Sequence, residues 1–186
     1  GAFVFSKHTE NKSLTRVVYP NESFDSDLSS LSFMPRRGGE HAVSIVKKMQ
    51  EKGKENGFWG FQRGNRHLAE GTPKVGFGYY QHGARYEKLI LFDLDGSKSF
   101  DKIHVNYTWV KLPVRFKIES VKAVFMSKIY RWFGYIMVDG DLSTSIQQQL
   151  PFIDVSQNWN DEKLYEYFCL TEEEINFIET FLNENN

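Results

Sequence analysis

The chain has 186 residues, of which 40% are hydrophobic and 16% aromatic, enough to build one sizeable core and too many for a disordered chain. It contains one cysteine, which excludes an internal disulfide and a cysteine-only metal site and favours a reducing, cytoplasmic setting. No apolar run reaches the roughly 18 residues that a membrane span requires, so we expect no contact with a membrane.

The formal net charge of −1 is divided unevenly along the chain. Residues 151–186 hold nine acidic residues and one lysine, a formal −8, whereas residues 1–150 hold 22 basic and 15 acidic residues, a formal +7. We therefore predict a basic α+β body over residues 1–157 and an acidic helical pair over 158–186, packed on the body or on a partner. A basic body favours a polyanionic partner. The two ends neutralising one another within the fold is the alternative.

The first element with a clear period is a helix that begins near Gly38 and Gly39. It follows a polar, loop-rich segment over 6–31 that contains one short apolar stretch at 17–19. Four apolar residues recur at helical spacing and share one face: Ala42, Ile45, Val46 and Met49. Gly53 or Gly57 is expected to end this helix.

From residue 58 to residue 138 the pattern changes to alternation and to β-branched or aromatic runs. Such runs, separated by Gly, Pro, Asp and Ser, predict six strands: 58–62, 74–80, 87–93, 103–110, 114–125 and 131–138. So many strands with little room for crossover helices favour an α+β fold with a curved, mostly antiparallel sheet or partial barrel. One helix in the N-terminal half and a C-terminal helical pair complete this prediction.

The acidic end has the signals of two capped helices rather than of a solvated tail. Asn160 or Asp161 can cap the first helix, and Thr171 stands three residues before Glu174, which is the spacing of a capping box. The acidic residues of the second helix are expected toward its start or in solvent: Glu172, Glu173, Glu174 and Glu179. Cys169 lies between Phe168 and Leu170, so we expect it to be buried.

The stretch from Asp93 to Gly96, an Asp-x-Asp-Gly after an apolar run, resembles the opening motif of the haloacid-dehalogenase phosphotransferases. That family needs a parallel sheet, which the run of consecutive strands argues against, so a hairpin turn is the favoured interpretation. A metal-dependent nuclease or phosphotransferase using Asp93, Asp95 and, for the nuclease, Glu119 remains an alternative. The five histidines show no ligand spacing, and we expect no metal and no cofactor.

A segment that interleaves aromatic, basic and amide side chains is the main candidate for function. Arginine and amide side chains read base edges, cations neutralise phosphates, and aromatic rings stack on exposed bases. The predicted nucleic-acid-binding residues are Arg36, Arg37, Trp59, Gln62, Arg63, Asn65, Arg66, His67, Lys74, Tyr79, Tyr80, Gln81 and Arg85. The competing interpretation is a sheet whose aromatic residues face a core and whose basic residues are merely solvated.

Residues 150–182, and more loosely 127–148, resemble the C-terminal end of bacterial restriction–modification proteins, namely adenine-specific DNA methyltransferases and type IIG-like enzymes. The matching residues are Pro151, Asp154, Ser156, Trp159, Asp161, Glu162, Leu164, Tyr165, Leu170, Thr171, Glu173, Glu174, Ile175, Phe177, Ile178 and Glu179. The chain lacks the Asn/Asp-Pro-Pro-Tyr/Phe motif and the glycine-rich cofactor loop of such enzymes.

The resemblance therefore implies a bacterial or phage target-recognition-like module that binds duplex DNA and is non-catalytic in this form. A catalytic domain or subunit missing from this chain would be its second partner. The remaining alternative is a structural, partner-docking domain, in which removing residues 158–186 would abolish complex formation and leave the body folded.

Overall fold

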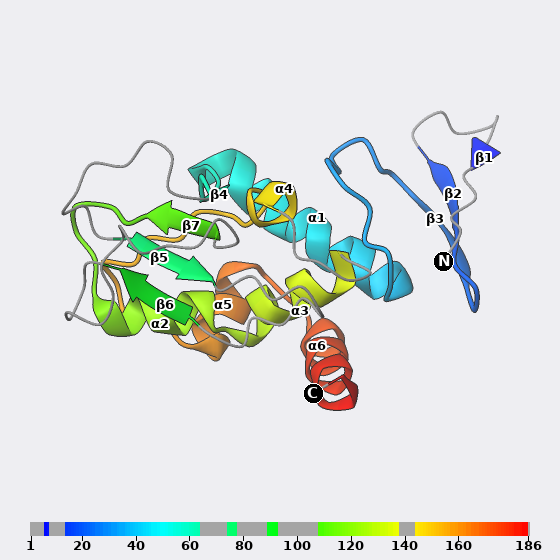
Figure 1. Ribbon diagram of the computed structural model, residues 1–186. Helices are drawn as coiled ribbons and strands as arrows, with labels where there is room; N and C mark the ends of the chain where they lie inside the picture. The colour runs from blue at the N-terminus through cyan, green and yellow to red at the C-terminus, as the bar shows by residue number, and fades with distance from the viewer. Residues whose placement is uncertain are drawn as a thin grey trace.

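The computed structural model describes residues 6–7, 14–63, 74–77, 89–92, 108–137 and 144–185, and the structural findings concern these residues. Helices dominate this part of the chain, and the strands are short (Figure 1). In chain order the elements are β1 (Ser6–Lys7), β2 (Thr15–Val18), β3 (Ser23–Ser26), α1 (Gly39–Asn56), β4 (Gln62–Arg63), β5 (Lys74–Phe77), β6 (Leu89–Phe92), β7 (Thr108–Lys111), α2 (Ile118–Phe125), α3 (Lys128–Met137), α4 (Thr144–Gln147), α5 (Asp161–Tyr167) and α6 (Glu172–Glu184).

Two separate antiparallel sheets lie at opposite ends of the long helix α1 (Figure 1). Strands β1, β2 and β3 form one sheet beyond its N-terminus. The other sheet lies near its C-terminus and has the order β4-β7-β5-β6. With 18 residues and a rise of 1.5 Å per residue, α1 keeps the two ends about 27 Å apart.

Helix α1 confirms the predicted apolar face, because Ala42, Ile45, Val46 and Met49 are all buried. It begins after Gly38 and ends at Gly57, both of which have positive φ values, 87° and 89°. Only glycine adopts such values without strain, which explains why these two residues bound the helix. The helix thereby carries one wall of the main core along its length.

The predicted six-stranded curved sheet or partial barrel is wrong. The segments 114–125 and 131–138 were predicted to be strands, but residues 118–125 form the helix α2 and residues 128–137 form the helix α3. Their β-branched and aromatic residues suggested strands, but the buried positions recur at helical spacing, as Ile129, Trp132, Phe133 and Ile136 do along α3. Strands remain at 74–77, 89–92 and 108–111, while 58–61 contributes only a bridge between Phe58 and Pro151.

The C-terminal helices are part of the main core. Leu164 and Phe168 from the α5 region and Ile178 and Leu182 from α6 are buried in the same cluster as the apolar face of α1. Asn160 Oδ1 accepts a hydrogen bond from the backbone N–H of Lys163 at 3.0 Å and caps α5. The capping box predicted at the start of α6 is present.

A short corner joins α5 to α6 at Cys169. This residue has a φ of 52°, in the left-handed region, and the neighbouring Leu170 N–H donates to the carbonyl of Tyr165 at 3.0 Å. The thiol is exposed, so the predicted burial of Cys169 is wrong. The left-handed turn needed to reverse the chain turns this residue out of the apolar run to which it belongs in the sequence.

No helix within the described ranges is long and apolar enough to cross a membrane.

Candidate nucleic-acid interface

The predicted binding residues are distributed between the two ends of α1, with several outside the described part of the chain. Arg36 and Arg37 precede the helix, while Gln62, Arg63 and Lys74 lie in the sheet near its far end. The predicted residues that fall outside the described ranges are Asn65, Arg66, His67, Tyr79, Tyr80, Gln81 and Arg85. Asp93 and Asp95, the carboxylates of the alternative enzymatic site, are also outside them.

Trp59 is a core residue and not an exposed stacking platform, which corrects its assignment as a base-binding residue. Its side chain is 2% exposed, and its ring centroid lies 4.9 Å from that of Phe125 and 4.7 Å from that of Phe152. The indole Nε1–H donates to the hydroxyl of Tyr130 at 3.3 Å. A buried aromatic ring with its polar atom satisfied is typical of a structural anchor.

Arg36 and Arg37 line a cavity of about 580 Å³ at the N-terminus of α1. A carboxylate of the chain itself occupies the helix end, because Glu22 Oε1 accepts the backbone N–H of Glu40 at 3.1 Å. A Cβ at Gly39 would lie only 1.1 Å from that oxygen, so glycine is required there for Glu22 to approach. The arrangement compensates the positive end of the helix internally.

The second sheet brings three predicted residues together around β7. Gln62 pairs with Trp109 and Arg63 with Thr108 on one side, and Lys74 pairs with Lys111 on the other. Residues that are up to 47 positions apart in the sequence thus become neighbours on adjacent strands. Gln62, Arg63 and Lys74 belong to one segment of the sequence, and the pairing of β4 and β5 with β7 brings their backbones close together.

Lys111, the last residue of β7, is an exposed cation at this end of the sheet. It forms no ion pair within the described residues. An anion bound beside Lys111 would therefore not have to displace a carboxylate of the described part of the chain.

The loop that follows β7 adds further cations beside Lys111. The sequence analysis did not include them among the predicted binding residues. Arg115 and Lys117 are exposed, and Val114 between Lys111 and these two cations is 100% exposed. Lys117 Nζ donates to Asn158 Oδ1 at 3.0 Å, while the nearby Glu119 is already paired with Lys122 at 3.0 Å. The alternation of basic and apolar residues in "KLPVRFK" (111–117) was the available signal, but residues 114–117 were interpreted as the start of a strand.

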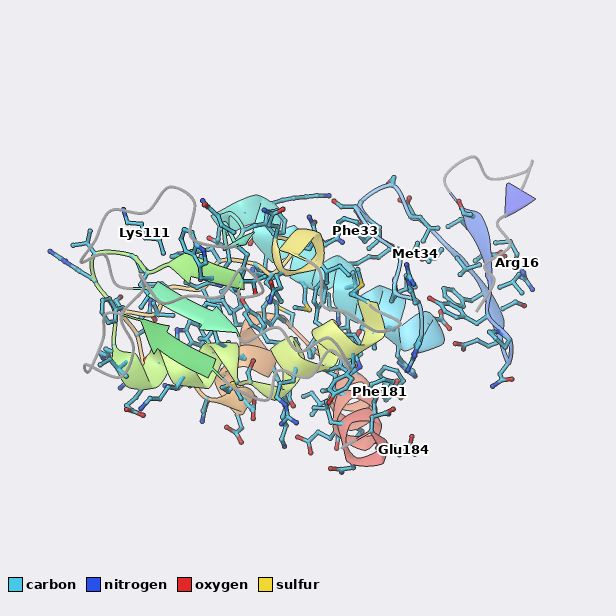
Figure 2. All side chains as sticks on the ribbon, in the orientation of Figure 1. Arg16, Phe33, Met34, Lys111, Phe181 and Glu184 are labelled. Carbon is cyan, nitrogen blue, oxygen red and sulfur yellow. The ribbon has the colours of Figure 1, made fainter. Side chains whose placement is uncertain are left out.

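We define the cationic end as the exposed residues Gln62, Lys111, Arg115 and Lys117. Figure 2 shows Lys111 at one extreme of the molecule and Arg16 of β2 at the other. Arg16 differs from Lys111 in being paired, since its Nη1 lies 3.3 Å from Asp25 Oδ2. The cationic end is therefore a local feature of the second sheet and its following loop.

An open, largely apolar hollow of about 390 Å³ adjoins the cationic end. Its described lining includes Phe58, Trp59, Phe152, Leu112 and Val114, with Lys111 as the charged group. The strand-like pairing of residues 57–59 with 150–152 holds its aromatic wall, through Trp59 N to Leu150 O at 2.9 Å and Phe152 N to Gly57 O at 2.8 Å.

The described residues contain no group of three or more His, Cys, Asp and Glu side chains that could hold a metal ion. Comparison of the chain with protein-family models, with curated proteins and with solved structures found no match.

Proposed function

We propose that this chain is a duplex-DNA-binding, target-recognition-like module of a restriction–modification system and is itself non-catalytic. The observation that carries the proposal is the cationic end, where the exposed Lys111, Arg115 and Lys117 follow one another on β7 and its loop and Lys111 has no acidic partner within the described residues. The similarity of residues 150–182 to restriction–modification proteins supports the same conclusion. A catalytic domain or subunit outside this chain would supply the chemistry.

Phosphate contact is the interaction that such a surface can make. Lysine and arginine side chains that neutralise phosphates release bound counterions, which makes binding strongly dependent on salt. Gln62, exposed on β4 beside the same strands, adds an amide group of the kind that reads base edges. The positive charges would then fix the position of the module on the duplex, and the amide would contribute to recognition.

The test is the salt dependence of binding to a fluorescently labelled duplex of mixed sequence, measured by anisotropy. The double variant Lys111→Gln/Arg115→Gln is expected to reduce the slope of log K against log salt by about 2, because each phosphate contact contributes about 0.9. Affinity at low salt should fall accordingly.

The matched control is Arg16→Gln/Lys47→Gln, which makes the same change in net charge elsewhere on the molecule. Arg16 is paired with Asp25, and Lys47 Nζ donates to Ser26 Oγ at 2.8 Å, so both belong to the region near the first sheet. The control should leave the slope unchanged. Binding that does not depend on salt, absence of binding at low salt, or equal effects of the two double variants would each refute the proposed function.

A further inference from the structure

We propose that the hollow beside the cationic end accepts one unpaired base of the bound DNA, with the adjacent phosphates held by Lys111 and Arg115. This inference rests on the proposed function and specifies which feature of the DNA the site recognises. It predicts that the protein prefers a duplex with an extrahelical base over a fully paired one.

The first support is the shape and composition of the hollow. Its volume of about 390 Å³ lies at the lower end of the range for small-molecule sites, about 300–1,000 Å³. Phe58 and Phe152 supply an aromatic wall, with the buried Trp59 packed against Phe152, and no carboxylate occurs among the described lining residues of the hollow. A nucleic-acid base has flat, apolar faces and polar atoms only at its edges. It therefore suits such a wall better than a charged group does.

The second support is that Phe58 is held as an exposed platform. Its side chain is 37% exposed, although its ring packs on α1 at Gly53. A Cβ at Gly53 would lie 2.0 Å from Cε1 of Phe58, so this contact requires glycine in the middle of the last helical turns. Glycine there costs the helix about 1 kcal/mol relative to alanine, and the close approach of the ring is what it permits.

The third support is charge complementarity at the rim. Lys111 lines the hollow, and Arg115 and Lys117 follow within the same loop. An apolar peptide in the hollow would bring no anion to Lys111 and Arg115, whereas a nucleotide places a base on the aromatic wall and phosphates beside these two cations. The rim therefore favours nucleic acid over a protein segment as the occupant.

The fourth support is Val114, which projects fully into solvent at the bend of the loop. Apolar side chains that lie between cations can enter a base step and unstack it. With the hollow directly adjacent, a base displaced in this way has an apolar surface to occupy. The loop and the hollow thus form one arrangement for holding an unpaired base.

The experiment compares three labelled duplexes of the same sequence with the full chain at constant salt. One is fully paired, one carries a single bulged nucleotide, and one carries a bulged abasic residue. The two bulges have the same number of phosphates, so their difference isolates the base. The bulged base is expected to bind at least about fivefold more tightly than the abasic bulge, from the stacking of one base on an aromatic surface.

Variants then locate the effect in the hollow. Gly60→Leu is expected to abolish the preference, because Gly60 lines the hollow and a Cβ added there meets no heavy atom within 4 Å. Phe58→Ala removes the ring and Gly53→Ala displaces it. Both variants should reduce the preference for the bulged base. The control is Phe33→Ala, an exposed phenylalanine (38%) outside the hollow, which should leave the preference intact. Circular dichroism of each variant checks that it is folded.

The outcomes separate this inference from the proposed function. Equal affinity for the base and the abasic bulge, together with salt-dependent binding of the paired duplex, overturns the inference and leaves the proposed function standing. A preference that survives in folded Gly60→Leu also overturns it and leaves the hollow to another occupant, such as a protein segment. No binding of any of the three duplexes at low salt refutes both.

Discussion

Glu174 is a carboxylate inside the protein, 3% exposed, held by groups from two helices. It accepts hydrogen bonds from Lys48 Nζ and Ser44 Oγ, both at 2.7 Å, and from the backbone N–H of Thr171 at 2.8 Å. One side chain thus completes the capping box of α6 and ties that helix to α1. Buried acids are tolerated when they are paired and hydrogen-bonded in this way.

We expect Glu174→Gln to lower the free energy of unfolding by about 2 kcal/mol at neutral pH, since Lys48 would lose its partner in a mostly buried site. Chemical denaturation monitored by circular dichroism measures this difference. Glu173→Gln is the control, because Glu173 is exposed on the same helical turn. Equal destabilisation by both variants would contradict the role assigned to Glu174.

The same carboxylate predicts a pH dependence. Burial raises the pKa of Glu174, but the hydrogen bonds from Lys48, Thr171 and Ser44 together outweigh burial. The pKa of Glu174 therefore lies below its ordinary value of 4.5. A depressed pKa in the folded state stabilises the protein above pH 4.5, and this contribution is lost as the pH falls through the folded-state pKa. Glu174→Gln should therefore flatten the acid limb of the stability curve, and an unchanged acid limb would contradict this.

The spacing of Thr171 and Glu174 was sufficient to predict the capping box, because that motif is local. Glu174 lies in the first turn of α6, as expected, but its burial was not predictable. Its partners Lys48 and Ser44 are 126 and 130 residues away in the sequence, and nothing in the local pattern indicates which helix α6 contacts.

At the scale of elements, local signals were reliable where glycines and caps bound a helix and unreliable where composition alone was used. α1, with glycines at both ends, and α6, with its capping box, were predicted. α2 and α3 were assigned to strands because aromatic and β-branched residues favour strands on average. Packing of both helices against the main core overrides that preference.

The contribution of α5 and α6 to the core predicts that the segment 158–186 cannot be removed without unfolding the rest. Leu164, Phe168, Ile178 and Leu182 are each almost fully buried. At about 1.5–3 kcal/mol for each side chain, their loss amounts to roughly 6–12 kcal/mol, comparable to the whole stability of a domain, about 5–15 kcal/mol.

Deleting 158–186 is therefore expected to abolish cooperative thermal unfolding, as measured by circular dichroism. A chain that ends after Glu184 is the control and should unfold as the full chain does. A cooperative transition in the chain that ends at residue 157 would instead support the separable helical pair that the partner-docking alternative requires.

At the scale of the whole molecule, the sequence indicated a basic body but not how its charges are distributed. It grouped Arg36 and Arg37 with the basic and aromatic segment after residue 58, since only a helix separates them along the chain. That helix is rigid and about 27 Å long, so the two groups lie at different ends of the protein. Proximity in the sequence across a helix does not imply proximity in space.

We expect Arg36→Gln/Arg37→Gln to leave the salt dependence of binding to a short duplex nearly unchanged. The Debye length is about 8 Å at 0.15 M salt, so charges that a helix of about 27 Å separates from the cationic end are screened from a ligand held there. Anisotropy titrations of this variant beside Lys111→Gln/Arg115→Gln measure the contrast. A loss of slope as large as that of Lys111→Gln/Arg115→Gln would show that both ends contact DNA.

The exposed corner at Cys169 makes the unaltered chain convenient for spectroscopy. Because the sequence contains a single cysteine and its thiol is exposed, a maleimide dye or spin label attaches at one position without any mutation. The corner is anchored, since Lys48 Nζ donates to the carbonyl of Cys169 at 2.9 Å, so the label has a defined origin. Energy transfer from this position to dyes at either end of a duplex would report how the protein is oriented on DNA.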